Sequence, residues 1–271
     1  MKKVLSIILT AAIAGTLFVG CGNARNKTSD NKNISTLEKI KSDKKIKIGL
    51  EDTYPPMEFR NEKNELVGFD IDVSKEIAKK LGAEPDFVIT EFGGLTMALN
   101  AGKFDMSISA ISVDEKRSKE VDFSEPYVKS GQAVIVKNDN SNIKSEGDLK
   151  GKNIGCQLGT TGEKAARKVE GVKDVKTYEK ATHPFQDLQI GRIDAIIVDE
   201  VVGRYYMGKD KGKFKIATTL NQEPIAIAFK KGDKQLEEEV KKAMGELYKD
   251  GTMSKLSEKW FGEDIYKDMK K

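Results

Sequence analysis

Short runs of β-branched and aliphatic residues alternate with helix-like stretches along this chain, and the alternation occurs twice. The first series predicts strands at residues 46–50, 87–90 and 106–110, with helices at 71–81 and 94–101 between them. The second series predicts strands at 153–156, 175–178 and 195–198, with helices at 160–169 and 184–190. Such alternation is typical of an α/β fold with largely parallel sheets, because each parallel pair needs a crossover, usually a helix. Two series in one chain predict two doubly wound lobes.

Two apolar runs are long enough to connect these lobes. Residues 130–137 follow the first series and residues 224–229 follow the second. We therefore expect a two-strand hinge with crossings near 130–137 and 222–228, beside a cleft between the lobes. The first lobe then comprises residues 46–132 and 226–271, and the second comprises residues 133–225.

The first 20 residues have the pattern of an export signal. Two lysines precede an uncharged run that is short for a membrane span and ends directly before Cys21. This context is typical of a bacterial lipoprotein whose cysteine becomes lipidated; the alternative is an ordinary secretory signal before an incidental cysteine. Residues 21–45 are rich in Asn, Lys and Ser, which predicts a flexible tether. We expect a chain that is lipid-anchored on the extracytoplasmic face of the cell membrane.

Composition excludes several kinds of site. Besides Cys21 the chain contains only Cys156, so a disulfide framework is excluded. His183 is the single histidine, and one histidine with one cysteine cannot build a typical zinc site. We expect Cys156 to be buried and inert, and His183 to lie in a loop. The 47 basic and 43 acidic side chains indicate a mixed surface, not a patch for nucleic acid, and no phosphate-binding or nucleophile motif predicts a cofactor.

Three polar stretches follow predicted strands, where open α/β sheets bind ligands. Residues 51–59 combine acidic and aromatic residues with a Pro-Pro pair, residues 109–127 combine small residues with Arg117, and residues 159–162 precede a helix. Each feature also has a structural interpretation. Arg117 is then a solvated helix charge, Asp199 a helix cap, and residues 159–162 a turn.

These stretches resemble the polar amino acid-binding proteins of ATP-driven importers, family 3 of the solute-binding proteins. The resemblance extends from about residue 46 to 265 and includes VGFDID at 67–72, FGGL at 92–95, GKFD at 102–105 and KWFG at 259–262. It implies a type II periplasmic-binding-protein-like fold and a monomer that captures a free amino acid by hinge closure. It also implies a membrane permease of an ABC importer as the partner.

The resemblance implies two ionic contacts with the ligand. Arg117 matches the arginine that binds the α-carboxylate, a role suited to a planar and permanently charged fork. Asp199 matches the residue that binds the ammonium group. The other implied ligand-binding residues are Ser112, Ala110 (through its backbone) and Thr161 (at a helix start) as donors, and Tyr54 and Phe92 as an aromatic pair around the ligand's side chain.

Ligand identity depends on Glu51 and Gln157, which match variable pocket positions. A carboxylate at Glu51 disfavours aspartate and glutamate through like-charge repulsion and favours a side chain that ends in an amide or a cation. Cystine and glutamine are preferred, and basic amino acids remain open. Alternatives to a transport receptor are an enzyme on the same fold, similar to cyclohexadienyl dehydratase with Glu51 as a general acid, and a sensor domain.

Overall fold

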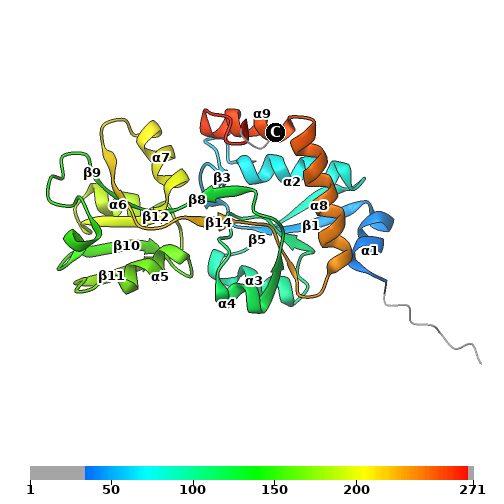
Figure 1. Cartoon of the computed structure of the whole chain (residues 1–271), viewed down its shortest axis with the longest axis horizontal. Coiled ribbons are helices and arrows are strands. Elements are labelled where there is room, and N and C mark those ends of the chain that lie inside the picture. The colour runs from blue at the N-terminus through cyan, green and yellow to red at the C-terminus, as the bar shows by residue number, and fades with distance from the viewer. Residues whose placement is uncertain (1–33, 268–271) are drawn as a thin grey trace, which may run out of the picture. The chain divides into compact units, whose positions relative to one another are not determined.

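The computed structural model describes residues 34–267, which form two lobes, each built on a five-stranded sheet (Figure 1). The predicted signal at 1–20 and the predicted lipidation site Cys21 lie outside the described residues. The first sheet has the order β5 (Glu84–Ile89), β1 (Lys45–Leu50), β6 (Met106–Ser107), β15 (Ala228–Lys230) and β7 (Val121–Phe123). The second has the order β11 (Asp174–Tyr178), β10 (Asn153–Gln157), β12 (Ala195–Asp199), β9 (Gln132–Lys137) and β13 (Phe214–Thr219).

Both sheets are largely parallel. In the first lobe β1 pairs in parallel with β5 and β6, and in the second β10 pairs in parallel with β11 and β12. Only β15 and β9 run against their neighbours. The predicted α/β architecture with two doubly wound lobes is therefore confirmed.

Helices cover both faces of each sheet (Figure 1). The first sheet lies between α2 (Phe69–Lys80), α8 (Lys234–Lys249) and α9 (Thr252–Phe261) on one side and α3 (Leu95–Asn100) and α4 (Glu115–Glu120) on the other. The second sheet lies between α5 (Thr161–Lys168) on one face and α6 (His183–Gln189) and α7 (Glu200–Lys209) on the other. Strand β9 illustrates the packing, because Val134 and Val136 join the core under α5 while Ile135 joins the core under α6 and α7.

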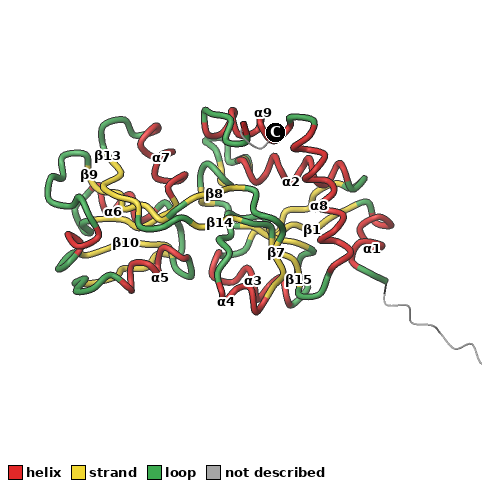
Figure 2. The backbone as a smooth tube through the Cα atoms, viewed as in Figure 1, coloured by secondary structure: helices red, strands yellow, loops and turns green. Residues whose placement is uncertain are grey.

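Two short antiparallel strands connect the lobes (Figure 2). They are β8 (Val128–Ser130) and β14 (Glu223–Ile225), and their register pairs Ser130 with Glu223. Most of the run 130–137, which we expected to be a crossing, is strand β9 inside the second sheet. The apolar character of this run comes from burial on both faces of that sheet, so the connection between the lobes is shorter than its pattern suggested.

Part of the predicted tether is a helix. Helix α1 (Thr36–Asp43) begins with a capping box in which Ser35 Oγ accepts from the Glu38 N–H and Glu38 Oε2 accepts from the Ser35 N–H. Leu37 and Ile40, three residues apart, are buried in the core of the first lobe. The prediction of a tether is therefore wrong for residues 36–43, since the polar composition concealed a cap and a narrow apolar stripe.

A small three-stranded sheet follows β1 in the first lobe. It consists of β2 (Thr53–Tyr54), β3 (Glu58–Arg60) and β4 (Leu66–Val67), all paired antiparallel. The remaining short elements are the 3-10 turns η1 (Phe92–Gly94) and η2 (Glu146–Leu149). The small sheet positions Tyr54, whose side chain is buried and directed toward the second lobe.

Candidate ligand-binding site

Strand ends of the two lobes meet in one place. Glu51 directly follows β1, while Gln157 and Asp199 end β10 and β12. Gln157 Nε2 donates to Glu51 Oε1 and Oε2 at 3.0 and 2.9 Å, and the Tyr54 hydroxyl donates to Asp199 Oδ2 at 2.6 Å. Each of these bonds joins one lobe to the other. Because α/β sheets bind ligands beyond the carboxyl ends of their strands, this crevice is the candidate site.

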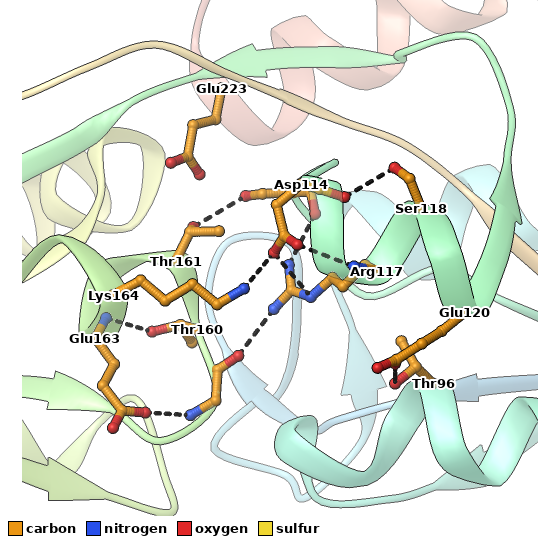
Figure 3. A network of polar contacts seen from close by, with 12 residues as sticks. Thr96, Asp114, Arg117, Ser118, Glu120, Thr160, Thr161, Glu163, Lys164 and Glu223 are labelled. Atoms are coloured by element: carbon orange, nitrogen blue, oxygen red, sulfur yellow. Dashed lines mark hydrogen bonds and ion pairs between the residues drawn. The ribbon is translucent and has the colours of Figure 1, made fainter.

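Arg117 lies in the wall of the crevice (Figure 3). Asp114 caps α4 by accepting from the Arg117 backbone N–H at 2.9 Å, which places Arg117 in the first turn of the helix. The guanidinium donates from Nη1 to the Ser112 carbonyl at 2.8 Å and from Nη2 to the Gly159 carbonyl of the second lobe at 2.9 Å. With 7% of its surface exposed, Arg117 is not the solvated helix charge of the structural interpretation.

Asp199 is the acidic counterpart in the second lobe. It is 4% exposed, and Gln132 Nε2 donates to Oδ1 at 2.6 Å while Tyr54 occupies Oδ2. Desolvation raises the pKa of Asp199 to about 6, although the hydrogen bonds from Tyr54 and Gln132 and the charge of Arg117 act against this rise. Asp199 directly precedes α7, but its side chain makes no capping hydrogen bond to that helix.

Arg117 and Asp199 influence each other electrostatically. Burial lowers the pKa of Arg117, and the carboxylates of Asp114, Asp199 and Glu223 oppose this effect. The Arg117 charge in turn favours the ionised form of Asp199. Arginine stays protonated in proteins, so the crevice carries a fixed cation from one lobe and a titratable anion from the other.

Thr161 brings a helix start to the same crevice. Thr160 caps α5 by accepting from the Glu163 N–H at 3.1 Å, so Thr161 is the first helical residue and its N–H has no intrahelical acceptor. The Thr161 hydroxyl lies 3.4 Å from Ser112 Oγ of the first lobe. Donors of both lobes therefore face each other near Arg117.

Glu51 and Gln157 form the other end of the crevice. Both side chains are 3% exposed. Desolvation raises the pKa of Glu51 to about 7, and the hydrogen bonds from Gln157 and Thr53 limit the rise. This end thus holds an acid that changes charge near neutral pH and whose partners are neutral.

Phe92 lies on the outer side of Arg117. Its ring centroid is 5.1 Å from Arg117 Cζ, which is a cation–π distance. Both residues line a cavity of about 320 Å³ between the lobes, together with Gly159 and Thr160. Tyr54 lies against Asp199 of the second lobe.

The comparison with protein families decides the class of this chain. Residues 46–263 match the model of a family described as bacterial extracellular solute-binding proteins, family 3. The chain belongs to this family. The resemblance seen in the sequence is therefore confirmed, and the chain is an extracellular solute-binding protein of family 3.

Individual relatives of this family 3 protein bind different amino acids. The L-cystine-binding protein TcyJ of Escherichia coli (strain K12) is 38% identical over 234 residues, which cover 85% of this chain and 88% of the relative. A solved ancestral arginine-binding protein bound to arginine is 44% identical with a TM-score of 0.77, covering 80% of this chain and 98% of that one. The ancestral amino acid-binding protein AncCDT-1, a precursor of cyclohexadienyl dehydratase, is 38% identical with a TM-score of 0.80, covering 84% and all of the respective chains.

Ala110 corrects one expectation about the site of this family 3 protein. Its backbone N–H donates to Asp70 Oδ2 at 2.8 Å and is therefore not available to a ligand, so the predicted donor role of Ala110 is wrong. Ala110 has a φ of 44°, in the left-handed region, and β6 ends at Ser107, short of the predicted Ala110. The group that Ala110 can still offer is its carbonyl, which accepts hydrogen bonds.

Three polar residues beside the site were not predicted from the sequence. Lys164 of α5 donates to Asp114 Oδ2 at 2.5 Å and so links the lobes (Figure 3). Glu223 of β14 affects the pKa values of both Arg117 and Asp199. Gln132 is 1% exposed and contacts Asp199. None of these residues belongs to a recognisable motif, and only their tertiary neighbours reveal them.

The described residues contain no candidate metal site. Within 34–267 no group of three His, Cys, Asp or Glu side chains is arranged to hold a metal ion. Cys156 is free and buried as expected, and burial raises the pKa of its thiol to about 12. His183 is exposed and is the first residue of α6, so the expected loop position is wrong by one residue. In the same part of the chain no helix combines the length and apolarity that a bilayer-spanning helix requires.

Proposed function

We propose that this chain captures a free polar L-amino acid between its lobes and delivers it to the membrane permease of an ABC importer. The observation that carries the proposal is the position of Arg117 and Asp199 in one crevice, one from each lobe, with each charge affecting the other's pKa. An α-amino acid presents a carboxylate and an ammonium at a fixed separation and requires opposite charges at matching positions. The similarity to cystine- and arginine-binding proteins supports this function.

Binding then proceeds by hinge closure. The ligand docks on the first lobe, where Arg117 and Ser112 receive its carboxylate, and the second lobe closes about β8 and β14. Closure brings Thr161 to the carboxylate and Asp199 to the ammonium. The carboxylate of Asp199 has about four acceptor positions, of which Tyr54 and Gln132 use two, so the ammonium adds a third donor.

L-Cystine is the ligand that best suits the end of the crevice formed by Glu51 and Gln157, here called the tail end. Glu51 is buried with only neutral hydrogen-bond partners, so a second ammonium on the ligand supplies the charge compensation that the carboxylate lacks. Arginine supplies a cation in the same direction and is the next candidate, whereas glutamine brings only an amide. The cystine-binding relative at 38% identity and the arginine-bound structure at 44% identity support these two candidates.

Calorimetry with a panel of amino acids tests this function. Purified protein is titrated at pH 8 with L-cystine, L-arginine, L-glutamine and L-glutamate. We expect stoichiometric binding, strongest for L-cystine, and no binding of L-glutamate, because its side chain meets the like charge of Glu51. Preferred binding of L-glutamate contradicts the assignment of Glu51, and the absence of any amino acid binding contradicts the function itself.

A second candidate function is catalysis on the same fold. Glu51 favours it, because a buried carboxyl group with a pKa of about 7 is suited to general acid chemistry, and AncCDT-1 is a precursor of a dehydratase. Incubation with a cyclohexadienyl acid such as prephenate distinguishes the two. Turnover that is lost in Glu51→Gln supports the enzyme, whereas stoichiometric amino acid capture without turnover supports the receptor.

A lipid at Cys21 is the proposed attachment of this monomeric receptor to the extracytoplasmic face of the membrane. The sequence around Cys21 is the basis for this assignment. Expression of the full chain in a bacterial host with a lipoprotein pathway, followed by fractionation, tests it. We expect the protein in the membrane fraction and Cys21→Ala in the soluble fraction, and equal partition of both contradicts lipidation.

A further inference from the structure

Gln132 is fixed where the hinge enters the second lobe. It is the first residue of β9 and follows the hinge strand β8 after Gly131. Its backbone N–H donates to Asn221 Oδ1 at 3.0 Å, and its carbonyl accepts from the Leu220 N–H at 2.7 Å. Both partners lie in the loop 220–222, where the second crossing begins before the hinge strand β14, so the backbone of Gln132 joins the two crossings.

The side chain of Gln132 contacts two proposed ligand-binding residues. Gln132 and Asp199 are opposite each other in the antiparallel register of β9 and β12. Gln132 Nε2 donates to Asp199 Oδ1 at 2.6 Å and to Thr161 Oγ1 at 3.1 Å. Glu223 Oε2 lies farther from the same nitrogen, at 3.5 Å. An amide nitrogen has two protons, and the two shorter bonds take them.

These two bonds determine what each partner can offer a ligand. Asp199 accepts from Gln132, which stabilises its ionised form. Thr161 Oγ1 also accepts from Gln132, so its own proton is directed elsewhere, toward Ser112 Oγ of the first lobe at 3.4 Å. Asp199 is thereby kept as an acceptor, which an ammonium group requires. The Thr161 hydroxyl is kept as a donor, which a carboxylate requires.

The orientation of the amide has a cost. Gln132 Oε1 is buried and has no hydrogen-bond partner among the described residues. A Cβ atom at position 162 would lie 2.8 Å from Gln132 Oε1, so Gly162 leaves the space that the amide oxygen occupies. The reverse orientation would direct Oε1 at the Asp199 carboxylate, where two acceptors repel each other. The contact with Asp199 thus fixes the orientation of the amide and leaves the amide oxygen without a hydrogen bond.

We propose that Gln132 is a positioning residue that sets the hydrogen-bond polarity of the crevice, keeping Asp199 an acceptor for the ammonium and the Thr161 hydroxyl a donor to the carboxylate. This inference rests on the proposed function, since it concerns how that site is prepared. Because Gln132 is also bonded to the second crossing, this polarity is set at the hinge itself.

The other groups that face Asp199 determine what happens when Gln132 is replaced. Arg117 and the Tyr54 hydroxyl favour the ionised form of Asp199, whereas Glu223 and the low exposure oppose it. The adjacent Glu200 carboxylate is paired with Arg204. Loss of the Gln132 hydrogen bond therefore moves the pKa of Asp199 upward from about 6.

Gln132→Met tests the inference, because it keeps the length of the side chain and removes both donors. Gln222→Met is the matched control, since Gln222 is exposed and lies in the second crossing. Binding of L-cystine and L-arginine is measured by calorimetry from pH 5 to 8. We expect Gln132→Met to bind at least about tenfold more weakly at pH 7.5, with a deficit that grows as the pH falls, because hydrogen bonds to charged groups are among the stronger ones. Gln222→Met should bind like the wild type at every pH.

A titration of Asp199 without any amino acid makes the test independent of the ligand. The carboxyl ¹³C signal of Asp199, assigned by its loss in Asp199→Asn, should titrate at higher pH in Gln132→Met than in the wild type. Gln132→Glu, which puts an acceptor beside Asp199, should shift it in the same direction and serves if the methionine variant does not fold. An unchanged titration, or an affinity loss that is equal at every pH, overturns the inference. If the wild type binds no amino acid, the proposed function fails, while this titration still decides the role of Gln132.

Discussion

The two ends of the crevice are built on different electrostatic principles. At the head end a permanent cation, Arg117, and an anion, Asp199, come from opposite lobes and lower each other's cost of burial. At the tail end Glu51 is equally buried, but its hydrogen-bond partners Gln157 and Thr53 are neutral. The difference teaches that the head end suits a group shared by all α-amino acids, whereas the tail end requires compensation from a particular ligand.

Replacement of the fixed cation should give the largest effect. Arg117→Ala leaves the ligand's carboxylate without its charged partner, and we expect a loss of about 2–5 kcal/mol of binding free energy for every amino acid that binds. Calorimetry measures the loss. Lys119→Ala is the matched control, because Lys119 is an exposed lysine on the same helix that pairs with Glu115. Near-normal binding by Arg117→Ala removes Arg117 from the site.

Acidification should weaken the head end next. A bound ammonium favours the Asp199 carboxylate, so the pKa of Asp199 is lower in the complex than the value of about 6 without ligand. The affinity for the ligand is then at its maximum above this pH. It falls as the pH decreases through this value, by about tenfold between pH 7.5 and 5. The measurement uses Glu51→Gln, which removes the titration of Glu51 from the pH profile. An affinity that is constant over this range contradicts contact between Asp199 and the ammonium.

The sequence predicted the positions of Arg117 and Asp199 better than the contacts that orient the groups around them. Arg117 and Asp199 follow strand ends and match a family pattern, and the α/β alternation located those strand ends. Gln132 could not be found this way, because its role depends on the register between β9 and β12, which joins residues 67 positions apart. The donor role of Ala110 was lost for the same reason, since Asp70 lies 40 residues away.

Two errors of the fold prediction had different physical origins. An apolar run of six to eight residues has the same pattern whether it crosses between lobes or is buried on both faces, so residues 130–137 were ambiguous. Helix α1 was not ambiguous, because Ser35 and Glu38 form a readable capping box ahead of Leu37 and Ile40. Composition alone had assigned those residues to a tether.

Removal of the tail-end carboxylate should separate the candidate ligands. With a pKa of about 7, Glu51 loses its charge as the pH falls from 8 to 6, so a ligand with a cation at its tip should bind about tenfold more weakly at the lower pH. Glu51→Gln should abolish this step for L-cystine and L-arginine, and should leave L-glutamine unaffected. Binding is compared at both pH values, with Glu65→Gln as the control, because Glu65 is exposed and accepts a hydrogen bond from Asn61 outside the crevice. A step that persists in Glu51→Gln shows that another group controls the tail end.

The ion pair that links the lobes beside the head end should give the smallest effect. Lys164 of α5 and Asp114 of the first lobe form it, and the lysine side chain is 43% exposed. Exposed pairs contribute about 0.2–1 kcal/mol, so Lys164→Met should weaken binding by up to about fivefold. Because the pair exists only while the lobes are in contact, the change should appear in the dissociation rate measured by stopped flow, with little change in association. Lys168→Met, an exposed lysine on the same helix, is the control and should dissociate like the wild type. If Lys164→Met alters the association rate instead, the pair steers the ligand into the crevice and does not hold the lobes together.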